Sequence, residues 1–196
     1  VAQNSQQIVY GGGPKDGLIV KFNESGQIEW SSYYGGNGDD KITSMSLGFQ
    51  GEIVFLGETS STNLITLDPI QPAFGGGASD VFVGMIDITG FLLRNTYWGS
   101  TGAEIAGKIT ATADYNYYFC GSTNSSSGIA QAGPQTTYGG GTYDGFLVKL
   151  DGSGLLQWST YIGGSAEDHA YAVQASSSRV VLVGKTASVN GVSTAG

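Results

Sequence analysis

One stretch decides the fold of this chain of 196 residues: Gln135-Thr-Thr-Tyr-Gly-Gly-Gly-Thr-Tyr-Asp144. Its pattern of a glutamine, a glycine triplet and an aspartate occurs twice more, at residues 71–80 and 7–16, at a spacing of 64 residues. Ten positions recur in all three copies, and in the first copy they are Gln7, Gly11, Gly12, Gly13, Asp16, Gly26, Tyr33, Gly35, Gly57 and Thr59. A fixed period of this length is typical of proteins built from one repeated structural unit.

Each repeat predicts four short strands. In the first repeat they are Gly17–Phe22, Gln27–Tyr34, Lys41–Leu47 and Glu52–Glu58. These runs are rich in Val, Ile, Tyr and Phe and are bounded by Gly, Asn, Asp or Ser, which is typical of strands. No stretch keeps a helical period over three turns. The sequence therefore predicts an all-β protein with one four-stranded antiparallel sheet in each repeat.

A sheet of this size is not stable by itself, so we expect the sheets to pack on one another. Residues 53–56 and 180–183 are apolar without alternation, which suits strands buried on both faces. Sheets that stack face to face around an axis form a β-propeller. The strand at Lys41–Leu47 and its copies have the smallest side chains, which predicts the innermost position, and Gln27–Tyr34 is then outermost.

With the strands assigned to inner and outer positions in this way, residues 1–196 are expected to form a single β-propeller segment. Two complete blades are expected at 39–102 and 103–166, the outer strands of a preceding blade at 1–38, and the inner strands of a following blade at 167–196. The two half-blades could pair and close a ring of three blades. Propellers typically have four to eight blades, so we expect the three repeats to be part of a larger propeller.

Composition excludes some classes of function. The formal net charge is −8 and only 12% of the residues are charged. Binding to nucleic acid needs clustered Lys and Arg, so no nucleic-acid partner is expected. No apolar run approaches the roughly 18 residues of a membrane helix, so no membrane insertion is expected. Cys120 is the only cysteine and is expected to be a small buried apolar residue.

The repeat resembles a known family. The third copy, residues 138–168, is similar to the bacterial β-propeller repeat called SBBP, for seven-bladed β-propeller, and the resemblance covers essentially the whole chain in three copies. The middle copy departs from it at Arg94, Ser100 and Ala103-Glu104. The resemblance implies a secreted or surface-displayed bacterial protein, often large and multi-domain. It also implies an adhesin-like role of the kind found in gliding bacteria with type IX secretion.

An acidic corner precedes each predicted innermost strand. Its carboxylates are candidate binding residues on one rim of the propeller, and they are Asp39, Asp40, Glu104, Glu167 and Asp168. Oxygen ligands at such a rim could bind Ca²⁺. No Asp-x-Asp-x-Asp-Gly loop accompanies them, and the alternative is that they hold a tight turn. No metal ligands are therefore assigned, and no cofactor is expected apart from this possible Ca²⁺.

The glycine triplets do not predict a phosphate site, because an aspartate and a strand follow them in place of a Lys-Ser/Thr pair and a helix. We expect Asp16, Asp80 and Asp144 to accept hydrogen bonds from backbone N–H groups of this turn. His169 is the only histidine, and no serine lies in a nucleophile motif. No catalytic residue is assigned, and the segment is expected not to be an enzyme.

Three functions remain open. The first is a non-enzymatic extracellular or cell-surface propeller that mediates interaction, adhesion or structural assembly, with other blades, other domains or a surface protein as partners. The second is a carbohydrate-binding module that uses loop and rim side chains. The aromatic residues of the outer strands either stack between blades or form a platform for sugars. The third is part of a propeller hydrolase or lyase whose catalytic residues lie elsewhere. The loops Thr59–Ser79 and Thr123–Tyr143 differ most between copies and are where binding is expected.

Overall fold

The computed structural model describes residues 6–64 and 66–191. Its regular structure consists of β-strands, and no helix long and apolar enough to cross a membrane occurs in these two ranges. The strands are β1 Gly17–Phe22, β2 Ile28–Tyr34, β3 Asp40–Leu47, β4 Ile53–Thr59, β5 Asp80–Ile86, β6 Leu92–Trp98, β7 Glu104–Ala111, β8 Tyr117–Thr123, β9 Asp144–Leu150, β10 Leu156–Ile162, β11 Asp168–Ser176 and β12 Arg179–Thr186. The four strands predicted in the first repeat are present to within one residue at each end.

The strands form antiparallel sheets. The order β3-β4-β5-β6 makes one four-stranded sheet and β7-β8-β9-β10 makes a second, while β1-β2 and β11-β12 are two-stranded. The two larger sheets have the same register, because Thr59 lies opposite Asp80 in the first and Thr123 lies opposite Asp144 in the second. None of the sheets is closed on itself.

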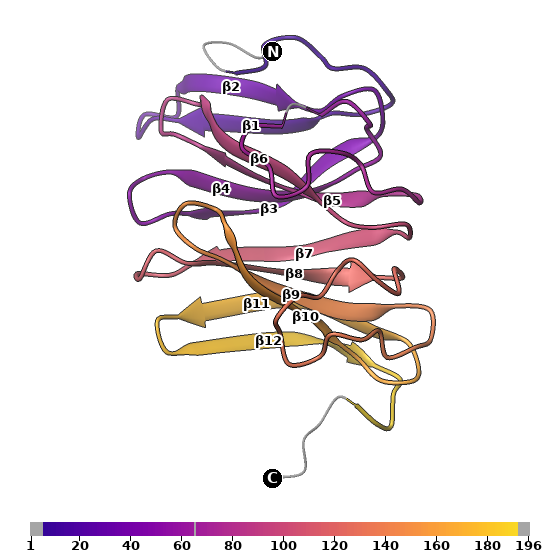
Figure 1. Ribbon diagram of the computed structural model, residues 1–196. Coiled ribbons are helices and arrows are strands. Elements are labelled where there is room, and N and C mark those ends of the chain that lie inside the picture. The colour runs from indigo at the N-terminus through magenta and orange to yellow at the C-terminus, as the bar shows by residue number, and fades with distance from the viewer. Residues whose placement is uncertain (1–5, 65, 192–196) are drawn as a thin grey trace.

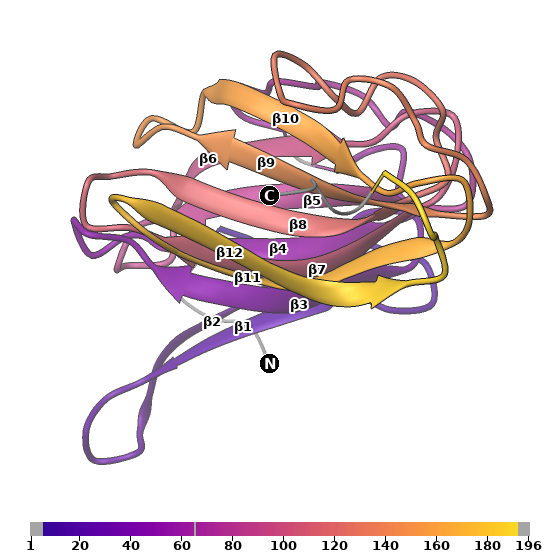
Figure 2. The same cartoon turned by 90° about the horizontal axis from the view of Figure 1, so that it is seen from below.

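The sheets are stacked one upon another in chain order, from β1-β2 to β11-β12 (Figure 1). Viewed along the stack, β3, β7 and β11 lie on one side and β6 and β10 lie on the opposite side (Figure 2). Small residues allow the first strands of neighbouring sheets to approach. A Cβ atom added to Gly107 in β7 would lie 2.8 Å from the backbone oxygen of Tyr171 in β11.

Hydrogen bonds also join these first strands. The hydroxyl oxygen of Ser44 in β3 accepts a hydrogen bond of 3.1 Å from the backbone N–H of Ile109 in β7. Ser46 accepts an equivalent bond of 3.1 Å from Ala111. Neighbouring sheets are therefore joined by polar contacts as well as by apolar packing.

Aromatic side chains fill the space between the sheets. Tyr34 of β2 lies 4.8 Å from Phe55 and 4.9 Å from Phe82 of the next sheet, measured between ring centroids. Trp98 of β6 lies 5.7 Å from Phe119 of the sheet that follows. All five side chains are buried, so these rings contribute to the core between repeats.

Each repeat also has a long irregular segment that lies along its outermost strand. Bridges pair Leu67 with Asn95 and Gln71 with Tyr97 in one repeat, and Gln131 with Ser159 in the next. These segments therefore pair with the open edges of β6 and β10.

Candidate functional site

The aspartate that follows each glycine triplet accepts a hydrogen bond from the first glycine of that triplet. Its Oδ2 atom lies 2.6 Å from the nitrogen of Gly11 in the first copy, 2.7 Å from that of Gly75 in the second and 2.6 Å from that of Gly139 in the third. The three acceptors are Asp16, Asp80 and Asp144. In each copy the carboxylate connects the turn to the start of the next strand.

The carboxylate at the start of each first strand accepts hydrogen bonds from the preceding corner and from the next loop. Asp40 Oδ2 accepts from the nitrogen of Gly36 at 2.8 Å and from the hydroxyl of Ser61 at 2.6 Å. In the third copy, Asp168 Oδ2 has the equivalent contacts, with Gly164 and Ser188, both at 2.7 Å. These side chains are buried, so their oxygens are not presented at the surface as ligands.

Glu104 occupies the same position in the middle copy but distributes its contacts differently. Its Oε1 atom accepts hydrogen bonds from the hydroxyls of Thr123 at 2.6 Å and Ser125 at 2.7 Å. Its Oε2 atom accepts only the backbone N–H of Ser100, at 3.1 Å, among the hydrogen bonds of the described chain.

The two sets of carboxylates meet in pairs at the junctions between neighbouring sheets. We call these junction pairs, and they are Asp16–Asp40, Asp80–Glu104 and Asp144–Asp168. A recurring glycine lies against each pair: Gly35, Gly99 or Gly163. A Cβ atom on Gly99 would lie 2.4 Å from Asp80 Oδ1 and 2.5 Å from Glu104 Oε2. The two oxygens therefore converge on one point.

Burial shifts the pKa of one member of each pair upward. Burial raises the pKa of Asp80 to about 7, and the nearby Glu104 adds to the effect. Burial, with a further contribution from Asp168, raises the pKa of Asp144 to about 6. The pKa of Asp16 is also raised by burial and by Asp40. Charge on these carboxylates is costly because they face like charges in a buried place.

The other two predicted rim carboxylates lie at the surface. Asp39 Oδ2 is 3.5 Å from Lys15 Nζ, and both side chains are more than half exposed. Nearby, Lys41 and Glu58 form an ion pair of 2.9 Å. These four charged side chains line a surface depression of about 180 Å³. Asp39 and Asp40 are therefore neighbours in sequence that face different surroundings.

Glu167 belongs to a network that the sequence did not reveal. Its Oε1 atom lies 2.7 Å from Lys185 Nζ and 3.0 Å from His169 Nε2. The other ring nitrogen of His169 lies 2.9 Å from the hydroxyl of Ser122, which belongs to the preceding sheet. Ser122 is buried, with only 2% of its surface exposed. The network joins two neighbouring sheets.

The expected carboxylates do not combine into a metal cage. No group of three or more His, Cys, Asp or Glu side chains suited to a metal ion occurs in residues 6–64 and 66–191. Each junction pair offers two carboxylates, from neighbouring sheets, whereas Ca²⁺ takes six to eight oxygen ligands.

A groove lies where the long segments of the two central repeats approach each other. It has a volume of about 330 Å³, and we call it the loop groove. Its lining residues are Ile70, Gln71, Trp98, Gly128, Ile129, Ala130, Gln131, Leu156 and Ser159. Grooves of this size lined by apolar groups with a few amides and hydroxyls are typical of binding sites.

Most aromatic residues of the outer strands are unavailable to a ligand. Trp30, Tyr34, Tyr97, Trp98 and Tyr161 are all less than 8% exposed. They pack between repeats, and a flat aromatic platform for sugars is not formed by them. The apolar surface of the loop groove comes mainly from aliphatic side chains.

Comparison with known proteins adds no family assignment. Neither a scan against protein-family models nor a search of curated proteins finds a match to this chain.

Proposed function

We propose that this chain is a segment of a β-propeller of the SBBP type. Under this proposal the blades span 39–102 and 103–166, with the outer strands of one further blade in 1–38 and the inner strands of another in 167–196. Two observations support it: the four-stranded antiparallel sheets have equal register, and they stack in chain order with their first strands on one side.

The propeller segment acts as a non-enzymatic interaction module of an extracellular or cell-surface protein. The observation that carries this role is the loop groove, because residues from two neighbouring repeats form it together. Apart from Gln71, its lining residues lie outside the ten recurring positions. The recurring residues hold turns and junctions, which leaves the variable segments free to determine what is bound.

The preferred partner is a protein surface that places an aliphatic side chain in the groove. Ile70 and Leu156, which are partly exposed, provide apolar contact above the buried Ile129, while the Gln131 side chain is exposed. A carbohydrate is the second candidate, bound through the exposed side-chain amide of Gln131. Membership in a larger hydrolase or lyase with catalytic residues outside the chain is the third.

Adhesion of chain-coated beads separates these functions. Beads are applied to films of collagen and fibrinogen, each with and without enzymatic removal of glycans, and to a glycan array. Retention that survives glycan removal supports the protein-binding role. Retention only on glycans supports the carbohydrate module, and turnover of a panel of glycan and peptide substrates by the chain would contradict a non-enzymatic role.

A further inference from the structure

The junction pair Asp80–Glu104 differs from the other two in the way its oxygens are used. Asp80 lies at the start of β5 and Glu104 at the start of β7, so the pair joins the two four-stranded sheets. Neither residue is exposed. The pair is therefore a buried contact between two carboxyl groups at the centre of the stack.

Hydrogen-bond donors surround the pair but leave a gap between its members. Asp80 Oδ2 accepts from the nitrogen of Gly75 at 2.7 Å and from the side-chain amide of Gln71 at 3.0 Å. Asp80 Oδ1 is buried and has no hydrogen-bond partner in the described chain. It faces Glu104 Oε2, since both atoms lie within 2.5 Å of the point where Gly99 would carry a Cβ atom. An acceptor therefore faces an acceptor.

Glu104 Oε2 can accept one more hydrogen bond. The hydroxyl donors Thr123 and Ser125 bind Oε1, and within residues 6–64 and 66–191 Oε2 receives only the N–H of Ser100. In the other two pairs the oxygen that faces the glycine already accepts two bonds: Asp40 Oδ2 accepts from Gly36 and Ser61, and Asp168 Oδ2 from Gly164 and Ser188. A carboxyl oxygen has two lone pairs, so only Oε2 retains a free one on the facing side.

The groups around the pair do not supply a positive charge. The titratable groups that face it are the phenols of Tyr97, near Asp80, and Tyr161, near Glu104. Tyr97 donates to the backbone oxygen of Ser61, and Tyr161 donates to that of Ser125. No Lys, Arg or His forms an ion pair with either carboxyl group in the part of the chain that the structure describes.

We propose that Asp80 and Glu104 form a proton-binding site that holds one proton between Asp80 Oδ1 and Glu104 Oε2 in the neutral pH range. The proton comes from water, bonds to Asp80 Oδ1 and is donated to Glu104 Oε2. Protonation removes the negative charge of the buried Asp80 side chain. It also turns Asp80 Oδ1, an acceptor without a donor, into a hydrogen-bond donor. Loss of the proton returns it to water and leaves two buried carboxylates facing each other, which destabilises the junction.

The direction of the pKa shift agrees with this arrangement. Burial, helped by Glu104, raises the pKa of Asp80 to about 7, while Asp144 in the third copy reaches about 6. In an unfolded chain an Asp titrates near a pKa of about 3.9. Since the folded pKa is the higher one, the stabilising effect of the proton is complete below about pH 4 and is lost as the pH rises through about 7.

The test is a titration of the carboxyl carbons of the full chain by ¹³C NMR, with Asp80 identified by the signal missing in Asp80→Asn. We expect Asp80 to titrate with a midpoint near pH 7. A midpoint near the ordinary value of about 4 would overturn the proposal. If Asp80→Asn does not fold, the Asp80 signal is assigned through the backbone resonances of the unmodified chain, and Glu104→Asp, whose shorter side chain withdraws from Asp80, should lower its midpoint; an unchanged midpoint would overturn the proposal.

A second measurement separates a proton from a cation. Urea midpoints of the chain and of Asp80→Asn are compared at pH 5 and pH 8, after dialysis against EDTA and again with CaCl₂. We expect the unmodified chain to lose stability between pH 5 and pH 8 while Asp80→Asn does not. The urea midpoint of Asp80→Asn should therefore rise relative to that of the unmodified chain, with or without Ca²⁺. A rise in the midpoint that needs Ca²⁺ and disappears in Asp80→Asn would show a cation site and overturn the proton assignment.

Discussion

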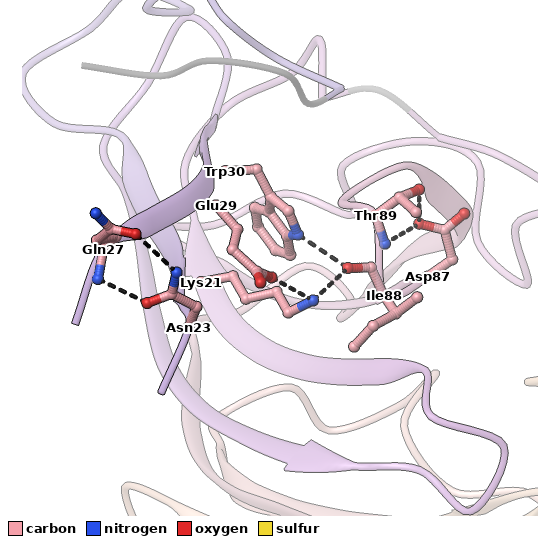
Figure 3. A network of polar contacts seen from close by, with 8 residues as sticks. All are labelled: Lys21, Asn23, Gln27, Glu29, Trp30, Asp87, Ile88 and Thr89. Carbon is pink, nitrogen blue, oxygen red and sulfur yellow. Dashed lines mark hydrogen bonds and ion pairs between the residues drawn. The ribbon is translucent and has the colours of Figure 1, made fainter. Parts of the chain in front are cut away.

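The indole Nε1 of Trp30 donates a hydrogen bond of 2.9 Å to the backbone oxygen of Ile88, which belongs to the turn of the next sheet (Figure 3). The ammonium group of Lys21 donates to the same oxygen at 3.3 Å and forms an ion pair of 2.7 Å with Glu29. The indole lies directly against Gly90, where an added Cβ would be 2.9 Å from Cδ2 of the ring. Trp30 therefore joins the β1-β2 hairpin to the β5-β6 turn by both packing and polar contact.

Replacement of Trp30 by Phe should destabilise the chain by about 1 to 2 kcal/mol, because the Ile88 oxygen loses its indole donor and the ring loses part of its buried area. Urea unfolding followed by circular dichroism measures the change. Trp158→Phe is the matched control, since Trp158 occupies the equivalent position on β10 and is only half-buried. Equal losses for the two variants would contradict the role given to the contact with the turn.

Gly99 is required by the space between the two carboxyl groups rather than by its backbone conformation. A Cβ atom there would overlap with Asp80 Oδ1 and Glu104 Oε2. Gly99→Ala should therefore destabilise the chain by about 2 kcal/mol, as expected for an overpacked buried site. The comparison is with Gly51→Asn: Gly51 has a φ of 89° and open space around it, and asparagine tolerates this conformation. A Gly99→Ala variant as stable as Gly51→Asn would contradict the close contact.

The third junction pair, Asp144–Asp168, should make the stability of the folded chain depend on pH in a range below that of Asp80–Glu104. Burial and Asp168 raise the pKa of Asp144 to about 6, above the value of about 3.9 expected when the chain is unfolded. The protonated Asp144 side chain therefore stabilises the folded state fully at low pH, and this stabilisation is lost as the pH rises from about 4 to about 6.

Asp144→Asn should remove this dependence, because the amide is neutral at every pH. Urea midpoints between pH 4 and pH 8 check it, and the ratio of variant to unmodified midpoint should rise up to about pH 6 and then stay constant. A ratio independent of pH would show that Asp144 has an ordinary pKa. Asp87→Asn is the control of opposite sign. Burial is the largest single influence on the pKa of Asp87 and raises it, but the hydrogen bonds from Thr89 and Phe91 together outweigh burial and lower the pKa.

The positions of the strands could be predicted from the sequence because the same turn residues flank each apolar run in all three copies. The strand Gly17–Phe22 was predicted with its observed bounds, and the strand predicted at Lys41–Leu47 begins one residue earlier, at Asp40. The placement of Cys120 as a small apolar residue is confirmed, since its side chain is fully buried. These features depend on local pattern, which a single sequence displays.

The candidate site was harder to predict because it depends on contacts between sheets. Asp80 and Glu104 belong to strands of different sheets, and their convergence at Gly99 follows from the stacking. The contact between Ser122 and His169 spans 47 positions and has no equivalent pair in the other copies. One signal was present in the sequence: the middle copy has Glu104 where the others have aspartate, and this extra methylene group redistributes the hydrogen bonds.

The most direct test of the account is whether the loop groove, rather than the recurring residues, determines binding. The measurement is retention of beads coated with Gln131→Arg on the film or array that retains the unmodified chain. Gln50→Arg is the matched control, because Gln50 is also an exposed glutamine and lies in the β3-β4 turn. The account predicts that Gln131→Arg lowers retention by about tenfold or more, equivalent to about 1.4 kcal/mol, with an unchanged urea midpoint, and that Gln50→Arg has no effect. Full retention of the Gln131→Arg beads, or an equal loss for both variants, would contradict it.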